Sequence, residues 1–275
     1  LDTNKKDVGI IHPAMTYATN IEFNGFNGST FYYREQGLVF RVATELIGAF
    51  NIYNILLAIK CCISLGIKPC DARKAVSQIH SIDGKGEKIS DKNIFIDYAH
   101  TPYALENLLL FLSKNKKNSQ KLITVFGCGG NRDASKRSLM GNIASKYSDV
   151  IILTTDNCRN EPLEKIISDI KKGIANDKQT FVINDRKEAI EYAIGNYSEN
   201  DIIAIVGKGH EKYIINETRT NNGNYVSDKE YLDLKMGHSV NVQEYLEAEN
   251  IDSYNGILDA QKVKQAVNIR KPFMF

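Results

Sequence analysis

The second half of the chain alternates short apolar runs with stretches in which apolar residues recur at helical spacing. The apolar runs, which predict strands, lie at residues 94–97, 122–126, 150–154, 180–183 and 202–206. The helical patterns lie at residues 102–112, 136–147, 162–174 and 186–197. Fully apolar strands separated by helices are typical of a parallel sheet covered on both faces. Because crossovers between parallel strands are right-handed, the pattern predicts an α/β, Rossmann-like doubly wound domain with a mostly parallel sheet.

The first part of the chain has a different pattern. β-branched and aromatic runs separated by Asn-Gly turns predict strands at residues 9–11, 29–33 and 38–42. Helical spacing then predicts two helices, at residues 48–66 and 71–79.

The polar, glycine-containing stretch 81–88 indicates a domain boundary. We therefore expect a first domain over residues 1–90 and a second over 91–235. The remaining residues, 236–275, do not continue the α/β alternation, and we expect a tail of unknown role with helices at 243–250 and 257–267.

Composition and charge narrow the functional classes. Of the 275 residues, 43% are hydrophobic and 25% are charged, which is typical of a soluble globular protein. A net charge of +2, from 35 basic and 33 acidic residues, favours neither nucleic acid nor a membrane surface as a partner. No apolar run approaches the roughly 20 residues of a membrane helix, and the charged first residues predict no signal peptide. The five cysteines lack a metal-ligand spacing, so we expect reduced thiols in a cytoplasmic protein. We also expect a monomer.

Polar motifs follow the predicted strands. The sequence DYAHTP at 97–102 has an Asp and a His that can reach ribose hydroxyls or phosphate, although a capping Asp or Thr beside a surface His explains it equally well. The sequence GCGGNRD at 127–133 combines glycines, which let the backbone approach a ligand, with Arg132, whose fork fits a carboxylate or phosphate. A plain sharp turn is the alternative for this second motif.

Two further motifs end strands in the same way. DNCRNEP at 156–162 mixes an acceptor, an amide and a cation, a set that suits a zwitterion, whereas an Asx turn before Pro162 is the alternative. GKGHE at 207–211 has two glycines around a Lys followed by a His–Glu pair, which favours a site over a loop.

A last motif, GAFNIYN, lies at residues 48–54. Asn51 and Asn54 are three residues apart, so they share one helix face and can read the edge of a base such as adenine. Solvated amides at a helix start are the alternative.

Together and in this order, these motifs resemble the Mur ligase family, over about residues 40–232. The resemblance implies the end of a central ATPase domain followed by a Rossmann-like C-terminal domain. It also implies a reaction of peptidoglycan synthesis. ATP, with Mg²⁺, phosphorylates the terminal carboxylate of UDP-MurNAc-L-Ala-D-Glu, and the amine of a diamino acid attacks the acyl phosphate to give an amide, ADP and phosphate.

The resemblance also implies roles for individual residues. Those expected to face ATP are Asn51, Asn54, Lys85, Asp97 and His100. Those expected to hold the amino acid are Arg132, Asp156, Asn157, Cys158, Arg159, Gly207 and Glu211. The D-N-x-R form is similar to that of members that add meso-diaminopimelate, in which the Arg meets the distal carboxylate. Lysine has no such carboxylate, so an Arg at this position fits a site that takes diaminopimelate and not lysine.

The chain departs from the family pattern at three points. Cys158 stands where Pro is usual, and Lys85 stands where a G-R-x-E motif has Arg, which keeps the charge but loses the fork. The chain has no P-loop motif G-x-x-G-K-[ST]. We therefore expect no catalytic residue and no metal ligand in these 275 residues, and no turnover by this chain alone.

Two alternatives to a diamino-acid ligase stay open. One is a related ligase of the folylpolyglutamate synthetase type, against which D-N-C-R and G-K-G-H-E argue. The other is a non-catalytic amino-acid-binding module derived from a Mur ligase.

Overall fold

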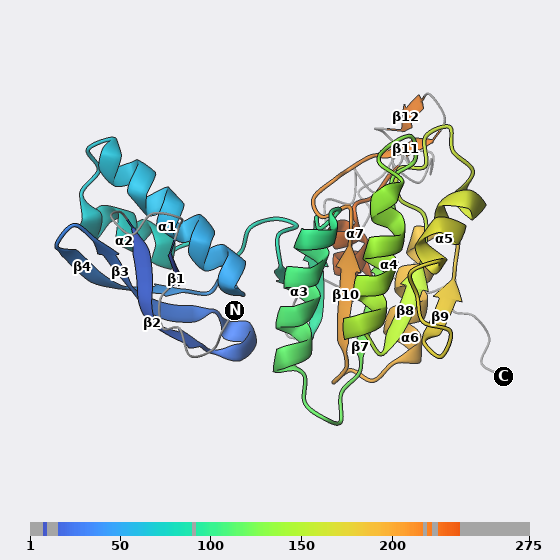
Figure 1. The fold of residues 1–275 in the computed structure, drawn as a ribbon, viewed down its shortest axis with the longest axis horizontal. Helices are drawn as coiled ribbons and strands as arrows, with labels where there is room; N and C mark the ends of the chain where they lie inside the picture. The colour runs from blue at the N-terminus through green and yellow to red at the C-terminus, as the bar shows by residue number, and fades with distance from the viewer. Residues whose placement is uncertain (1–7, 10–15, 90–91, 217–218, 222–224, 237–275) are drawn as a thin grey trace, which may run out of the picture.

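The computed structural model describes residues 8–9, 16–89, 92–216, 219–221 and 225–236, which form two lobes side by side (Figure 1). The first lobe is an antiparallel sheet in chain order with two helices against it. Its elements are β1 (Val8–Gly9), β2 (Tyr17–Phe23), η1 (Gly25–Asn27), β3 (Ser29–Glu35), β4 (Leu38–Thr44), α1 (Ala49–Ser64) and α2 (Pro69–Ser77).

The core of the first lobe lies between this sheet and α1. In β3 the buried Phe31 and Tyr33 alternate with more exposed neighbours, as a sheet with one covered face requires. On α1, Ile52, Leu56 and Ile59 are at most 1% exposed and recur at helical spacing on the side that meets the sheet.

The second lobe contains a six-stranded sheet in the order β5-β6-β10-β7-β8-β9. All neighbours pair in parallel except β5, which is antiparallel to β6. The strands are β5 (Glu87–Ile89), β6 (Ile94–Asp97), β7 (Leu122–Phe126), β8 (Val150–Leu153), β9 (Gln179–Val182) and β10 (Ile202–Val206). The predicted α/β class with a mostly parallel sheet is confirmed.

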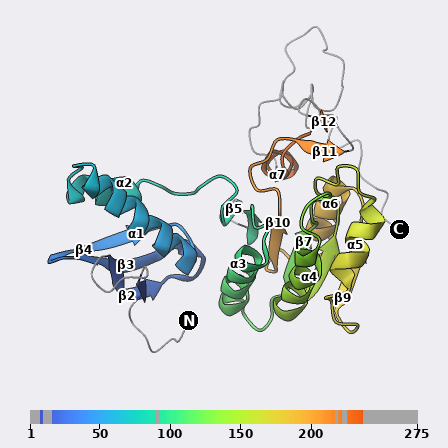
Figure 2. The same cartoon turned by 45° about the horizontal axis from the view of Figure 1, so that its top comes forward.

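Helices cover both faces of this sheet (Figures 1 and 2). Phe95 of β6 packs with α3, α4 and α5, whereas its neighbours Ile94 and Ile96 pack with α6 and α7 on the opposite face. This alternation is the period-two geometry of a strand buried on both sides. The helices are α3 (Pro102–Asn115), α4 (Ser135–Tyr147), α5 (Leu163–Lys171), α6 (Arg186–Asn196) and α7 (Asp228–Met236). A short hairpin of β11 (Ile214–Asn216) and β12 (Arg219–Asn221) precedes α7.

The strand order places the site. Strand β10, the last parallel strand of the chain, lies between β6 and β7, the first two. The loops that leave β6, β7 and β10 therefore meet at one edge of the sheet, and the loop after β8 lies beside them. Ligands of open α/β sheets bind at such a switch point.

The lobes meet through aromatic packing and a cavity. The Phe26 ring of the first lobe lies 4.9 Å from the Phe95 ring and 6.0 Å from the Phe111 ring of the second, measured between centroids. Beside this contact is a cavity of about 440 Å³, whose lining includes Ile47 and Lys85.

One strand of the first lobe was missed, and some predicted segments stay untested. Strand β2 was not predicted; the polar Asn20 with φ of 50°, and a register shift between Thr19 and Glu22, interrupt its alternation. Residues 10–11 of the first predicted strand and the predicted tail helices lie outside the described residues. Within the described ranges, no helix is long and apolar enough to cross a membrane.

Candidate functional site

Two loops at the carboxyl ends of β7 and β8 are joined by hydrogen bonds. The amide of Gly130 donates to the carbonyl oxygen of Asn157 at 2.9 Å, and the amide of Asn160 donates to the side-chain oxygen of Asn131 at 3.0 Å. A Cβ atom added to Gly130 would lie 1.8 Å from the carbonyl oxygen of Cys158. Glycine is thus required at 130 because the neighbouring loop passes where a side chain would begin.

Arg159 and Arg132 both lie near Gly129. A Cβ atom at Gly129 would be 3.1 Å from Nη1 of Arg159 and 3.8 Å from Cγ of Arg132. Arg159 has a φ of 52°, which side chains rarely adopt, and its Nη1 donates to the carbonyl oxygens of Gly130 at 3.0 Å and Asn157 at 3.2 Å. Arg132 is exposed. The two predicted carboxylate-binding side chains are therefore close together.

A buried arginine beneath these loops holds them in place. Arg137 on α4 has a fully buried side chain, and its guanidinium binds both oxygens of Glu161, at 2.8 and 2.7 Å. It also bonds Asp169 at 3.1 Å and the carbonyl oxygen of Gly129 at 3.2 Å. The hydrogen bonds from Arg137 and from the Asn131 amide hold the pKa of Glu161 far below its usual value.

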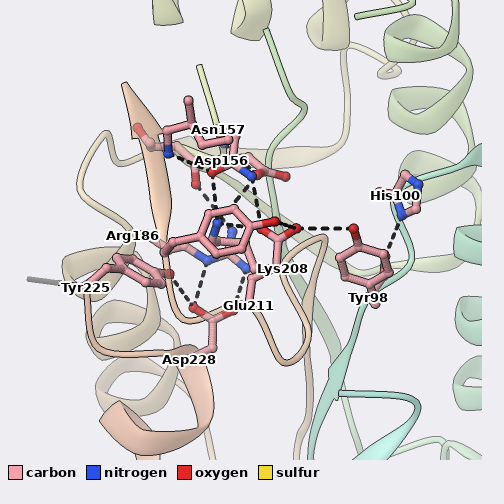
Figure 3. A network of polar contacts seen from close by, with 12 residues as sticks. Tyr98, His100, Asp156, Asn157, Arg186, Lys208, Glu211, Tyr225 and Asp228 are labelled. Carbon is pink, nitrogen blue, oxygen red and sulfur yellow. Dashed lines mark hydrogen bonds and ion pairs between the residues drawn. The ribbon is translucent and has the colours of Figure 1, made fainter. Parts of the chain in front are cut away.

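The loop after β10 provides the carboxylate of Glu211, whose two oxygens each accept two hydrogen bonds (Figure 3). Its Oε2 accepts from the ammonium of Lys208 and the side-chain amide of Asn157, both at 2.9 Å. Its Oε1 accepts from the hydroxyls of Tyr98 and Tyr213, both at 3.1 Å. Burial opposes charge on Glu211, but these donors outweigh it and leave its pKa below the usual value. Glu211 is therefore ionised at neutral pH.

Lys208, the partner of this carboxylate, is fully buried. Besides Glu211, its ammonium contacts the side-chain oxygen of Asn157 at 3.1 Å and lies 4.0 Å from a carboxylate oxygen of Asp156. Asp156 in turn accepts from the amide of Asn157, and its other oxygen would lie 3.1 Å from a Cβ atom at Gly207. The strand ends of β8 and β10 thus share one polar network.

A second ion pair, between Arg186 and Asp228, contacts the same strand ends (Figure 3). Arg186 on α6 binds Asp228 of α7 through two hydrogen bonds of 2.9 and 2.7 Å. The same guanidinium donates to the carbonyl oxygens of Thr155, after β8, at 3.3 Å and Val206, in β10, at 3.1 Å. It therefore ties the ends of these two strands together.

Three of the predicted ATP contacts surround Tyr98, after β6. The Lys85 ammonium lies 4.7 Å from the centre of the Tyr98 ring, and the ring of His100 lies 4.7 Å from it, edge-on. Asp97 is nearly buried and accepts from the amide of Ala99 at 2.7 Å, yet burial raises its pKa to about 6. Lys85, Asp97 and His100 therefore form one group at the edge of the second lobe.

Asn51 and Asn54 lie on α1 in the first lobe. The side-chain amide of Asn51 is buried and donates to the carbonyl oxygen of Ile47 at 2.9 Å. Asn54 donates to the side-chain oxygen of Asn51 at 3.2 Å. The Asn51 amide is thus already hydrogen-bonded inside the protein, and Asn54 is the more accessible of the two amides.

Comparison with known proteins decides the family. Residues 85–209 match the Mur ligase, glutamate ligase domain. A UDP-N-acetylmuramoyl-L-alanyl-D-glutamate--2,6-diaminopimelate ligase of Aquifex aeolicus (strain VF5) is 46% identical over 190 residues, which are 68% of this chain and 39% of that protein. The chain belongs to the Mur ligase family.

Solved structures agree with this placement in the Mur ligases. A structure of a UDP-N-acetylmuramoyl-L-alanyl-D-glutamate--2,6-diaminopimelate ligase has 32% identity and a TM-score of 0.54, and the match covers 83% of this chain and 47% of that one. A Mycobacterium tuberculosis folylpolyglutamate synthase, at 18% identity and a TM-score of 0.58 over 69% of this chain and 44% of that one, shares the fold. The present chain spans about two fifths of the length of the curated Mur ligases that it matches, from 36% to 42%.

Sequence reasoning missed several residues on which this candidate site depends. Tyr98 and Lys208 stood within recognised motifs but were given no role, because the full burial of Lys208 becomes visible only in the structure. Arg137 also stood beside a motif. The Arg186–Asp228 pair had no local signal, because its members are 42 residues apart and outside every motif.

Proposed function

We propose that this chain is the amino-acid-binding part of an ATP-dependent, ADP-forming ligase of peptidoglycan synthesis. The ligase would join a diamino acid, meso-diaminopimelate, to UDP-MurNAc-L-Ala-D-Glu. The names of the relatives support this substrate pair, and the D-N-x-R motif supports a diamino acid with a second carboxylate. A cytoplasmic location fits, because both ATP and the free cysteines among the described residues belong to a reducing compartment.

One observation carries the proposal: cations and a carboxylate converge at neighbouring strand ends. Arg132 and Arg159 lie together at Gly129, and Asn157 links the Arg159 loop to Glu211. A guanidinium pairs with a carboxylate and a carboxylate with an ammonium, so this arrangement matches the two charged groups at the distal end of diaminopimelate. We assign the substrate-binding role to Arg132, Asp156, Asn157, Cys158, Arg159, Gly207 and Glu211.

The group around Tyr98 fits one end of a nucleotide. Lys85 offers a cation at the lobe junction, and Asp97 and His100 offer groups for ribose or phosphate. We assign Asn54 to contact the adenine base. Asn51 would orient Asn54 by accepting its hydrogen bond. When bound, ATP would supply the phosphoryl group that activates the acceptor carboxylate. No group of three or more His, Cys, Asp or Glu among the described residues is placed for a metal, so we assign none of them to Mg²⁺.

Domain limits follow from the same assignment. We propose that residues 1–90 belong to the ATP-binding domain and 91–235 to the amino-acid-binding domain, and that the chain acts as a monomer. The lobe division in Figure 1 and the match over residues 85–209 support a boundary near residue 85–90.

Calorimetric titration tests the proposal. Meso-diaminopimelate should bind the wild-type chain, and Arg159→Ala should weaken it roughly ten- to a hundred-fold, since a charge-assisted pair contributes about 1.5–3 kcal/mol. Arg73→Ala, which changes an exposed arginine of α2 in the first lobe, should leave the affinity unchanged. L-lysine should bind weakly and be insensitive to Arg159→Ala. Equal affinities for lysine and diaminopimelate would refute the substrate assignment.

A further inference from the structure

Tyr98 contacts both halves of the candidate site with different parts of one side chain. Its hydroxyl donates to Oε1 of Glu211 at 3.1 Å, on the amino-acid side. Its ring lies under the Lys85 ammonium, 4.7 Å from it. On the same nucleotide side, the ring lies against the ring of His100 (Figure 3). The His210 ring adds a third contact, at 5.5 Å between centroids.

The backbone beneath this ring is held firmly. The amide of Tyr98 donates to the carbonyl oxygen of Gly84 at 2.8 Å, and a Cβ atom at Gly84 would lie 2.3 Å from the amide nitrogen of His210. Gly84 belongs to the segment between α2 and β5, which links the two lobes. The backbone of this segment therefore packs against the backbones of the loops after β6 and β10. A conformational change at this point is therefore made by the Tyr98 side chain and not by its main chain.

The two oxygens of Glu211 are not equivalent. Oε2 is held by Lys208 and Asn157, and Lys208 is fully buried with its charge compensated there. Oε1 is held by the hydroxyls of Tyr98 and Tyr213 alone among the described contacts. A ligand ammonium is a stronger donor to a carboxylate than a phenol is, so it would compete for Oε1. Its arrival changes what the Tyr98 hydroxyl can bond.

We propose that Tyr98 is a positioning residue that couples the amino-acid site to the nucleotide site, an inference that rests on the function proposed above. An ammonium at Oε1 of Glu211 reorients the Tyr98 phenol, and the same ring supports Lys85 and His100. A nucleotide that engages Lys85 and His100 in turn sets the orientation of the phenol. Such coupling is reciprocal: each ligand changes the affinity of the other by the same factor.

Tyr213 provides a matched control. Its hydroxyl donates to the same oxygen of Glu211 at the same distance, 3.1 Å. Its ring faces the Lys208 ammonium at 5.5 Å instead of Lys85 and His100. Tyr213→Phe and Tyr98→Phe therefore each remove one hydroxyl bond to Oε1 of Glu211, but only in Tyr98→Phe did the lost hydroxyl belong to the ring that contacts Lys85 and His100.

The test measures meso-diaminopimelate affinity by calorimetry with and without saturating Mg²⁺ and a non-hydrolysable ATP analogue. In the wild-type chain the two affinities should differ by about five-fold or more, the lower end of ordinary allosteric coupling. Tyr213→Phe should weaken both affinities and keep their ratio. Tyr98→Phe should also weaken binding but bring the ratio to one, so that the two affinities fall by different factors. A wild-type ratio of one, or an unchanged ratio in Tyr98→Phe, overturns the proposal.

A second readout does not depend on nucleotide binding. Diaminopimelate should shift the imidazole NMR signal of His100, assigned with His100→Gln, in the wild type and in Tyr213→Phe but not in Tyr98→Phe. A His100 signal that stays still in the wild type while diaminopimelate binds also overturns the coupling. Failure of the wild-type chain to bind diaminopimelate at all is a different result, because it removes the proposed function itself.

Discussion

Asp228→Asn should destabilise the second lobe and loosen the site without changing a side chain in it. Asp228 and its partner Arg186 have side chains that are 1% and 3% exposed. Burial alone would lower the pKa of Arg186, but Asp228 raises it above its usual value, so the guanidinium is charged. The substitution keeps the shape of residue 228 and removes the only carboxylate that contacts Arg186 among the described salt bridges. It leaves a buried charge without a counter-charge.

The expected loss follows from this geometry. Removing one partner of a buried ion pair costs about 3–5 kcal/mol. Asparagine retains one oxygen that can accept from Arg186, which places the estimate near the lower end, at about 3 kcal/mol. For a domain of this size that corresponds to a fall in melting temperature of about 6–12 °C. At an m-value of about 2–3 kcal/mol per M, the urea midpoint falls by about 1–1.5 M.

Urea unfolding followed by circular dichroism measures this loss, and hydrogen exchange of the β10 amides assigns it to the second lobe. Asp177→Asn, at an exposed position, is the control and should lie within about 0.5 kcal/mol of the wild type. Replacing both partners, as Arg186→Met with Asp228→Leu, should recover much of the loss, since the unpaired charge is gone. A loss below about 1 kcal/mol in Asp228→Asn would refute the view that this pair holds the strand ends together.

Two further predictions concern Asp97 and Gly130. Burial raises the pKa of Asp97 from 3.8 to about 6, so the folded chain takes up a proton more readily than the unfolded one. The stability of the wild type relative to Asp97→Asn should therefore increase as pH falls from about 7 to about 4 in urea titrations, and a constant difference would contradict this. Gly130→Ala should abolish diaminopimelate binding in calorimetry, because its Cβ would lie 1.8 Å from the carbonyl oxygen of Cys158. Gly195→Ala, in a helix with no atom within 4 Å of the added Cβ, should preserve binding and gain up to about 1 kcal/mol of stability.

The sheet of the second lobe could be predicted because its strands are buried on both faces. Such strands form uninterrupted apolar runs, and β7 and β10 coincide with the predicted residues. The convergence of Arg132, Arg159 and Glu211 was also predictable in outline, since parallel strands deliver their following loops to one edge.

The parts that could not be predicted depend on which partner each polar side chain contacts. Whether Asn51 turns outward or is used within its helix depends on how the Ile47 carbonyl is placed, which no spacing reveals. Lys208 required knowledge of the groups that compensate it, and these come from the loop after β8 and from Glu211. Polar residues in a motif can be found from sequence, but their division into ligand-binding and supporting groups needs the contacts.

The arginines of the site show how that division works. Arg137 and Arg186 face carboxylates, Glu161 with Asp169 and Asp228 respectively, so their charges are neutralised inside the fold. The hydrogen bonds of the Arg159 guanidinium go to the carbonyl oxygens of Gly130 and Asn157, which orient the side chain but carry no net charge. These bonds orient Arg159, and no salt bridge within the described part of the chain neutralises its charge. A guanidinium held in this way gains most from a ligand that brings its own carboxylate, and this is the physical reason that the site should select diaminopimelate over lysine.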